Sequence, residues 1–434
     1  MPCRIIECRN QRDIAELAQW LAGRSEDQSG IEDKVREIMR RVREDGDSAL
    51  VEYGREFDCR GLRKQDLLVS EQEIGQALDK VPAEDLVILE EAVENVTRFH
   101  EAQVERSWWT TGPDGAVLGQ MVRPVDRVGL YVPGGKGGST PLISSLIMNA
   151  VPARVAGVEQ IAVCSPPTPE GGLNPYLLAT AKLLGITEII RAGSAWAVAA
   201  LAYGTESIKP VDVIAGPGNI FVATAKRLLT GRVGLDMIAG PSEIIVLADE
   251  SADPDYIAAD LLSQAEHDSM ASSILVTTNE NLTKSVPEAL KKQLGELPRR
   301  EIAEKSLSDW GAIVICPDTE TTMEVVNALA PEHLELMVED PWSLLPGVRH
   351  AGAVFLGAHA PEPVGDYFAG PNHVLPTMGT ARFSSALSVS DFCKKTSIVA
   401  ASAEYTRKHG AKIARLARLE GLEAHARSVE IRLK

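Results

Sequence analysis

Val128-Gly-Leu-Tyr-Val-Pro-Gly-Gly-Lys-Gly-Gly138 is the stretch that decides the fold, because a short β-rich run ends here in a glycine-rich loop. A helical stretch, 142–156, follows the loop, and the next β-rich run begins at Gln160. This order is typical of a parallel sheet with helices on its faces. The loop lies where a Rossmann-like unit binds pyrophosphate, although it matches neither Gly-x-Gly-x-x-Gly nor the Walker sequence. A tight turn without a ligand is the alternative.

The alternation of β-rich and helical stretches continues through the middle of the chain, on both sides of Met237-Ile-Ala-Gly-Pro241. The first series has β-rich runs at 128–132, 160–164, 188–190 and 211–215 and helical stretches at 142–156, 176–184, 195–203 and 220–229. The second has β-rich runs at 243–248, 272–277, 312–316, 334–338 and 353–356 and helical stretches at 256–267, 282–294 and 321–329. They predict an α/β fold of two tandem Rossmann-like domains, each with a parallel sheet.

The segments outside these two series are predicted to be helical. Residues 31–57 and 82–104 carry apolar side chains at three- and four-residue spacing. After Leu387 the pattern turns helical again, and the chain ends in a charged tail, Arg407 to Lys434. Such a tail often packs on a partner subunit, and a solvated helix is the alternative.

The composition is that of an ordinary globular protein that does not bind polyanions. The 434 residues carry a net charge of −17, which opposes non-specific binding to nucleic acid or to an anionic membrane. No apolar run is long enough to span a membrane, and no signal-peptide pattern begins the chain, so we expect a cytoplasmic protein. Six cysteines without a Cys-x-x-Cys pair indicate free thiols rather than disulfides or a thiolate zinc site.

Two pairs of residues could carry chemistry. Gln264 and His267 are spaced to share one face of a helix, so both could bind one metal ion, and imidazole is a common zinc ligand. Glu332 and His333 lie between a helical and a β-rich stretch, where an acid and an imidazole suit proton transfer. Taken alone, a helix-end histidine bonded to backbone and a capping glutamate are the simpler interpretations.

Three further motifs are ambiguous when taken singly. Gly365-Asp366 to Asn372-His373 forms a glycine- and proline-containing loop whose Asp366 and His373 could bind metal or substrate, or only shape a turn. Glu420 to His425 lies in the tail, where a solvated helix end is the simpler interpretation. Gly216-Pro-Gly-Asn219 is a second strand-to-helix turn that could contact a ligand.

In combination these motifs resemble the histidinol dehydrogenase family over nearly the whole chain. The ordered set is Val128 to Gly135, Gly216 to Asn219, Ile238 to Glu243, Ser263 to His267, Ala330 to His333, Gly365 to Thr377 and Glu420 to His425. The resemblance implies oxidation of L-histidinol to L-histidine in two NAD-dependent steps, through an aldehyde that stays bound. It also implies a homodimer whose C-terminal tail reaches the partner's active site.

The resemblance also implies roles for individual residues. One zinc ion per subunit would be bound by Gln264, His267, Asp366 and His425. His333 would be the general base, and Glu332 would activate water in the second oxidation. Substrate would contact the zinc ligands and His333, together with Ser242, His373 and Glu420. NAD would contact Tyr131 and Asn219, and also Trp196, which stands where the family usually has glutamine and could stack on the cofactor.

The resemblance further implies five segments. These are an N-terminal helical tail (1–25), a helical first part of the catalytic domain (26–130), an NAD-binding domain (131–241), a zinc-binding second part of the catalytic domain (242–386) and a dimerisation tail (387–434). The glycine-rich loop up to Thr140 is longer than is usual in the family. A relative that oxidises another small alcohol, such as a sulfonated propanediol, is the alternative function. A metal-dependent hydrolase without a nucleotide is a rival from another class.

Overall fold

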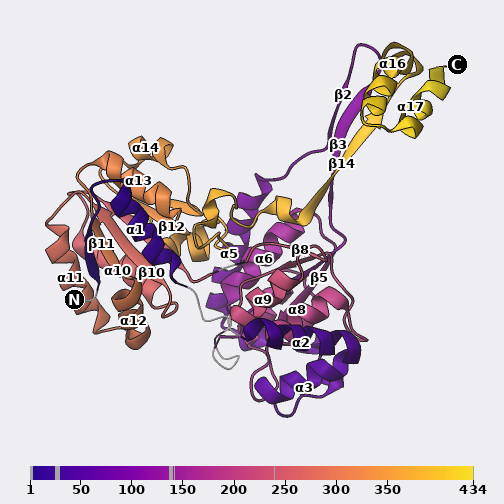
Figure 1. Cartoon of the computed structure of the whole chain (residues 1–434). Helices are drawn as coiled ribbons and strands as arrows, with labels where there is room; N and C mark the ends of the chain where they lie inside the picture. Colours follow the sequence, from indigo (N-terminus) through magenta and orange to yellow (C-terminus); the bar gives the residue numbers. More distant parts are fainter. Residues whose placement is uncertain (1–2, 25–29, 136–139, 141, 239, 434) are drawn as a thin grey trace.

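Two parallel sheets with helices on both faces form the body of the protein, and a long arm projects from it (Figure 1). The computed structural model describes residues 3–24, 30–135, 140, 142–238 and 240–433. The predicted α/β fold of two tandem parallel-sheet units is confirmed. No helix in these ranges is long and apolar enough to cross a membrane.

The first sheet has the strand order β6-β5-β4-β7-β8, and all its pairings are parallel. Its strands are β4 (Arg127–Tyr131), β5 (Gln160–Ser165), β6 (Glu188–Arg191), β7 (Val213–Ala215) and β8 (Gly234–Leu235). Its covering helices are α6 (Ile143–Val155), α7 (Pro175–Leu183), α8 (Ser194–Tyr203) and α9 (Ile220–Leu228). The central strand β4 is buried along its whole length, as expected for a strand covered on both faces.

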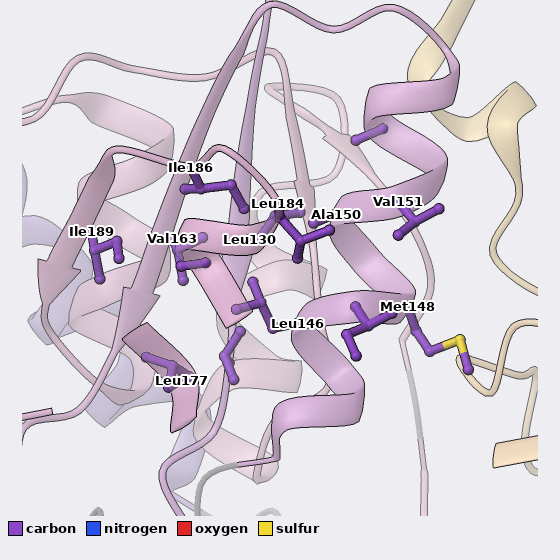
Figure 2. Close-up of a cluster of buried hydrophobic side chains, with 14 of the residues drawn as sticks. Leu130, Leu146, Met148, Ala150, Val151, Val163, Leu177, Leu184, Ile186 and Ile189 are labelled. Atoms are coloured by element: carbon purple, nitrogen blue, oxygen red, sulfur yellow. The ribbon is translucent and has the colours of Figure 1, made fainter. Parts of the chain in front are cut away.

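Alternate side chains of the first sheet enter two separate cores. Leu130 of β4 and Val163 of β5 pack with Leu146 of α6 on one face (Figure 2). The next residues along the same strands, Tyr131 and Cys164, pack with α8 and α9 on the other. This alternation follows from the two-residue period of a strand, and it aims Tyr131 at the α8 side.

The second sheet has the strand order β1-β11-β10-β9-β12-β13 and is also parallel throughout. Its strands are β1 (Arg4–Glu7), β9 (Glu243–Ala248), β10 (Ser272–Thr277), β11 (Ala312–Ile315), β12 (His333–Met337) and β13 (Ala353–Leu356). Its helices are α1 (Gln11–Ala22), α10 (Pro254–Ala265), α11 (Leu282–Leu294), α12 (Arg300–Trp310), α13 (Thr319–Leu329) and α14 (Pro341–Leu344). The segment predicted as an N-terminal helical tail therefore contributes an edge strand as well as a helix.

The remaining N-terminal helices pack on the first sheet. They are α2 (Ile31–Asp45), α3 (Asp47–Phe57), α4 (Glu71–Gly75) and α5 (Ala83–Glu101). Helices α2 and α3 contact α8, and α5 contacts α6. The sequence predicts that residues 26–130 belong to the same domain as the second unit. The observed contacts differ from this prediction, because the apolar faces of these helices are buried against the first sheet. The domain boundaries as a whole stay a prediction.

The arm is a three-stranded antiparallel sheet with two helices at its end (Figure 1). It consists of β2 (Trp108–Thr111), β3 (Val117–Pro124), β14 (Cys393–Ala400), α16 (Ala403–Leu419) and α17 (Glu423–Glu430). The helical pattern predicted directly after Leu387 is wrong over Cys393–Ala400. This segment becomes a strand because it pairs with β3, and pairing partners override local preference in sheets.

The connection from β13 to the arm returns to the first sheet. It contains the one-turn helix α15 (Glu362–Val364), the π-type turn Gly365–Ala369 and the 3-10 turns Thr380–Arg382 and Val389–Phe392. The Asn372 side-chain amide donates to the Met148 carbonyl of α6 at 2.6 Å. The Thr377 hydroxyl accepts from the Gly240 backbone N–H at 2.6 Å. This segment therefore ties the two sheet units together near the start of β9.

A substitution of Gly216, which directly follows β7, would test how closely β7 and β4 approach each other. Its φ is +128°, and a Cβ there would lie 2.1 Å from the Tyr131 carbonyl oxygen. Gly231 has φ +85° with open space around it, so it is a matched control. We expect Gly231→Ala to cost about 1–2 kcal/mol from the positive φ. Gly216→Ala should cost about 1–3 kcal/mol more because of the overlap. Urea unfolding measures both, and equal losses would contradict the close approach.

Candidate active site

The predicted catalytic residues lie where β9 and β12 begin, at the amino edge of the second sheet. β12 starts at His333, which pairs with Ile244 of β9. Glu332 directly precedes His333 and Glu243 directly precedes Ile244, so the two glutamates lie side by side. Both Glu332 and His333 are buried. The pairing of these two parallel strands thus brings Glu332 and His333 next to Glu243, which lies 89 positions before Glu332 in the sequence.

The backbone of Glu243 holds both catalytic candidates. Its N–H donates to Glu332 Oε2 at 2.9 Å, and its carbonyl oxygen lies 3.0 Å from His333 Nδ1. A carbonyl oxygen only accepts, so Nδ1 carries the proton in this contact. In neutral His333 the lone pair therefore belongs to Nε2, which is buried and has no hydrogen-bond partner. This is the geometry of a general base.

Carboxylates gather in front of His333 Nε2. Asp366 Oδ1 lies 3.6 Å away and Glu362 Oε1 lies 4.0 Å away. Burial disfavours imidazolium, but Glu332, Asp366 and Glu362 outweigh it and raise the pKa of His333 to about 10. Burial itself raises the pKa of Glu332 to about 8 and that of Glu362 to about 7. Asp366 and Glu362 therefore place carboxyl oxygens side by side in front of the imidazole, where a bound cation would favour their ionised forms.

His333, Glu362 and Asp366 offer ligand atoms within 4.8 Å of one another, which suits a divalent cation. Gln264, at the end of α10, joins this group. With its amide oxygen facing the Glu243 N–H at 2.6 Å, its nitrogen donates to both Glu362 oxygens at 2.9 Å. Glu362 is thus a member of the cluster that the sequence did not reveal.

Two other predicted histidines lie within electrostatic reach of the cluster. Desolvation lowers the pKa of His267, and Asp366 and His333 also act on it. Desolvation likewise lowers the pKa of His373, with Asp366 and His333 again among the charges that act on it. The Nε2 atom of His373 is buried and has no hydrogen-bond partner. Ser242 directly precedes Glu243 and is half-buried. The structure therefore places the predicted metal-binding, proton-transfer and substrate-contacting residues of the body near the start of β9 and β12, apart from the predicted cofactor residues.

The two predicted residues of the tail lie elsewhere in this chain. Glu420 follows α16 and His425 lies in α17, both at the far end of the arm (Figure 1), and both are exposed. The arm holds them there, since Asp114 in the β2–β3 turn accepts from His409 of α16 at 2.8 Å. Within one chain, the metal-ligand set predicted by the resemblance is therefore incomplete.

The predicted cofactor residues lie at the carboxyl edge of the first sheet. The Tyr131 hydroxyl, at the end of β4, accepts from the Ser194 N–H at 3.0 Å, and burial raises the pKa of Tyr131 to about 12. The Asn219 side chain caps α9 by accepting from the Phe221 and Val222 N–H groups. A cofactor could contact either residue at this edge. Residues 136–139 of the glycine-rich loop lie outside the described residues.

Trp196 requires a correction. Its side chain is only 5% exposed, and its indole stacks against Tyr53 and Phe57 with ring centroids 5.5 Å apart in each pair. Helix α3 supplies Phe57 and Tyr53, and it covers this part of α8. The indole is thus a core side chain rather than an open stacking surface for a cofactor.

The arm exposes an unusual amount of apolar surface. On its strands, Trp108 is 52% exposed and Trp109 is 66% exposed. On its first helix, Leu416 is 63% exposed and Leu419 is 65% exposed. Large apolar side chains grouped on a projecting element indicate a surface that another protein chain covers.

Known proteins resemble this chain over its whole length. A family model described as histidinol dehydrogenase matches residues 21–433. A histidinol dehydrogenase of Nitratidesulfovibrio vulgaris is 60% identical over 432 residues, covering 100% of this chain and 99% of the relative. One of Oleidesulfovibrio alaskensis is 60% identical over 433 residues, covering 100% of both. A crystal structure of histidinol dehydrogenase from Elizabethkingia anophelis superposes with a TM-score of 0.91 at 35% identity, covering 99% of this chain and 98% of that one.

Replacing Asp366 by Asn or Glu362 by Gln should weaken binding of a divalent cation. Asp366 offers oxygen ligands, and Glu362 orients Gln264. Loss of a partner that orients a ligand typically costs about 10–100-fold in metal affinity. Calorimetric titration of chelator-treated protein with zinc chloride measures the effect. Glu339→Gln, an exposed change just beyond the other end of β12, is the control. Unchanged affinity in both cluster variants would show that the cation binds elsewhere.

Proposed function

This chain belongs to the histidinol dehydrogenase family, and from that premise we propose that it oxidises L-histidinol to L-histidine with NAD as hydride acceptor. The observation that carries the proposal is the environment of His333. Its Nδ1 is held by a carbonyl, and its Nε2 is free and faces acids that could bind a cation. An alcohol oxidation by hydride transfer needs such a base to accept the hydroxyl proton.

In the first oxidation, His333 Nε2 accepts the hydroxyl proton of L-histidinol, and the carbon that bears this hydroxyl transfers a hydride to NAD. The base must be neutral at that moment, whereas the surrounding carboxylates favour the imidazolium form. Neutralising Asp366 and Glu362 lowers the pKa of His333 toward the operating pH. Zinc supplies that neutralisation, orients the substrate and stabilises charge when it is bound. Gln264, His267 and Asp366 would hold it, with His425 of a second copy of this chain.

In the second oxidation, the aldehyde must gain water before another hydride can leave. Glu332 is the group that we assign to activating this water. Its Oε2 is held by the Glu243 N–H, and it lies 3.7 Å from His333 Nδ1. Its raised pKa of about 8 lets this carboxyl hold or release a proton near neutral pH. Ser242, which directly precedes Glu243, and the buried His373 would contact the substrate.

NAD would bind at the carboxyl edge of the first sheet, with Tyr131 and Asn219 among its contacts. Ligands of open parallel sheets bind outside this edge, next to helix N-termini. Both residues belong to strand-to-helix connections there. Trp196 would support this edge from the core, because its helix α8 begins at Ser194, whose N–H binds Tyr131.

The working enzyme would be a homodimer with shared active sites. Two observations support this: the ligand set is incomplete within one chain, and the arm exposes the apolar side chains Trp109, Leu416 and Leu419. Exchange of the arms would bury that surface and carry Glu420 and His425 to the partner's cluster. The arrangement is that of an isologous two-fold dimer.

His333→Asn should lower kcat for L-histidinol by about 10²–10⁴-fold, because a general base contributes that much. Zinc content should stay near that of the unchanged protein. NADH absorbance measures turnover, and elemental analysis after gel filtration measures zinc. His359→Asn, an exposed histidine on the same sheet unit, is the control. No NADH from the zinc-loaded unchanged protein would overturn the function itself. Loss of zinc in His333→Asn would overturn the division between base and ligand.

Mixing inactive His425→Ala and His333→Asn chains should restore activity. If sites are shared, half of the sites in a heterodimer combine a normal tail with a normal body. After subunit exchange is verified by differently tagged chains, turnover per heterodimer should approach half that of the unchanged dimer. Mixing His333→Asn with Asp366→Asn is the control, because both changes lie in the body of the chain. If subunits exchange only their tails, each site of that heterodimer still has one altered body residue, so no activity returns. Recovery in the control alone, or in neither mixture, would contradict the shared site.

A further inference from the structure

Arg24 is a buried arginine that the mechanism above does not use. It lies two residues beyond α1, and its side chain is 2% exposed. The guanidinium forms an ion pair with the carboxylate of Glu243, which is itself buried. Its other donors reach the Leu21 carbonyl at 3.3 Å and the Met270 carbonyl at 3.5 Å. A buried arginine held this fully has one defined position.

The partner of Arg24 is the residue that orients both proton-transfer groups. The Glu243 N–H holds Glu332 Oε2, and the Glu243 carbonyl holds His333 Nδ1. If the carboxylate of Glu243 lost its cation, it would be a buried charge without compensation and would move toward water. The peptide groups on either side of its Cα would move with it. Both the general base and the water-activating carboxyl would then be displaced together.

We propose that Arg24 is a positioning residue for both oxidation steps. It acts through Glu243, since its hydrogen bonds go to Glu243, Leu21, Met270 and Met378 rather than to the acid cluster. The proposal rests on the proposed function of Glu332 and His333. It would give the segment before residue 25 a part in the chemistry, although its strand β1 lies at the edge of the sheet away from β12.

The cavity beside this ion pair permits a sharp test. It has a volume of about 150 Å³, and Arg24, Glu243, Pro331 and Met378 are among the residues that line it. Removing the Arg24 side chain would enlarge this space, so an added guanidinium ion could take the place of the lost group. Added guanidinium restores the positive charge beside Glu243 without the covalent link to residue 24. Recovery of activity on its addition would show that the variant is folded and lacks only this charge.

The experiment compares R24A, R24K and the control R12M, whose arginine makes an exposed ion pair with Glu16 on α1. Turnover is measured with L-histidinol and separately with the aldehyde L-histidinal. For R24A we expect kcat to fall about 10²-fold for both substrates, the cost of a displacement of about 1 Å. The KM for NAD should stay near its original value, because the predicted NAD contacts Tyr131 and Asn219 belong to the first sheet unit. Guanidinium chloride at millimolar concentration should restore much of the R24A activity, and R12M should show no change.

The outcomes separate this proposal from the proposed function. If the unchanged protein makes no NADH from L-histidinol, the proposed function fails. If it is active and a folded R24A keeps its kcat, the Arg24 proposal fails alone. If R24A does not fold, R24K decides, because lysine keeps the charge but loses the fork of donors. A folded R24K should lose about tenfold in kcat at unchanged KM for NAD, and an unchanged kcat would overturn the proposal. A lower kcat for only one of the two substrates, L-histidinol or L-histidinal, would also overturn the Arg24 proposal.

Discussion

The contact between His333 Nδ1 and the Glu243 carbonyl is the interaction on which the site depends. It follows from the parallel pairing of β12 with β9, which sets His333, the first residue of β12, level with Ile244 and so next to Glu243, the first residue of β9. It assigns the proton to Nδ1 and leaves the lone pair on Nε2, which the proposed role as a base requires. The pairing of β9 with β12 holds this 3.0 Å contact, and the buried ion pair between Arg24 and Glu243 lies directly beside it.

The carboxyls around this imidazole would be costly if they were only structural. Glu332 and Glu362 are buried, and burial raises the pKa of each. A fold that needed only a core would place apolar side chains there, which are often as stable or more stable. Acids are retained where a cation or a proton must be handled. Burial of these acids is thus unfavourable for stability, and the apolar cores on both faces of the second sheet offset that cost.

Most of the body could be predicted from the sequence because its strands are short apolar runs between clear turn signals. Strand β9, for example, occupies the predicted residues Glu243–Ala248. Strands β1 and β14 could not be predicted, because their partners lie about 300 residues away and only the folded chain supplies them. Glu362 had a weak signal, its spacing of four residues before Asp366. Arg24 had none, since its role depends on a contact with a residue 219 positions later.

The arm shows why part of the site cannot be understood from one chain. Three strands form a stable sheet only when one face is covered, yet Trp109 of β2 and Val399 of β14 are 66% and 74% exposed. Covering these side chains requires another surface, and in the proposed homodimer a second copy of this chain would supply one by symmetry. The same exchange would bring His425 to the cluster formed by His333, Glu362 and Asp366. Exchange of the arms would then both cover these exposed side chains and complete the proposed metal site, which gives one physical reason for the two features to occur in the same chain.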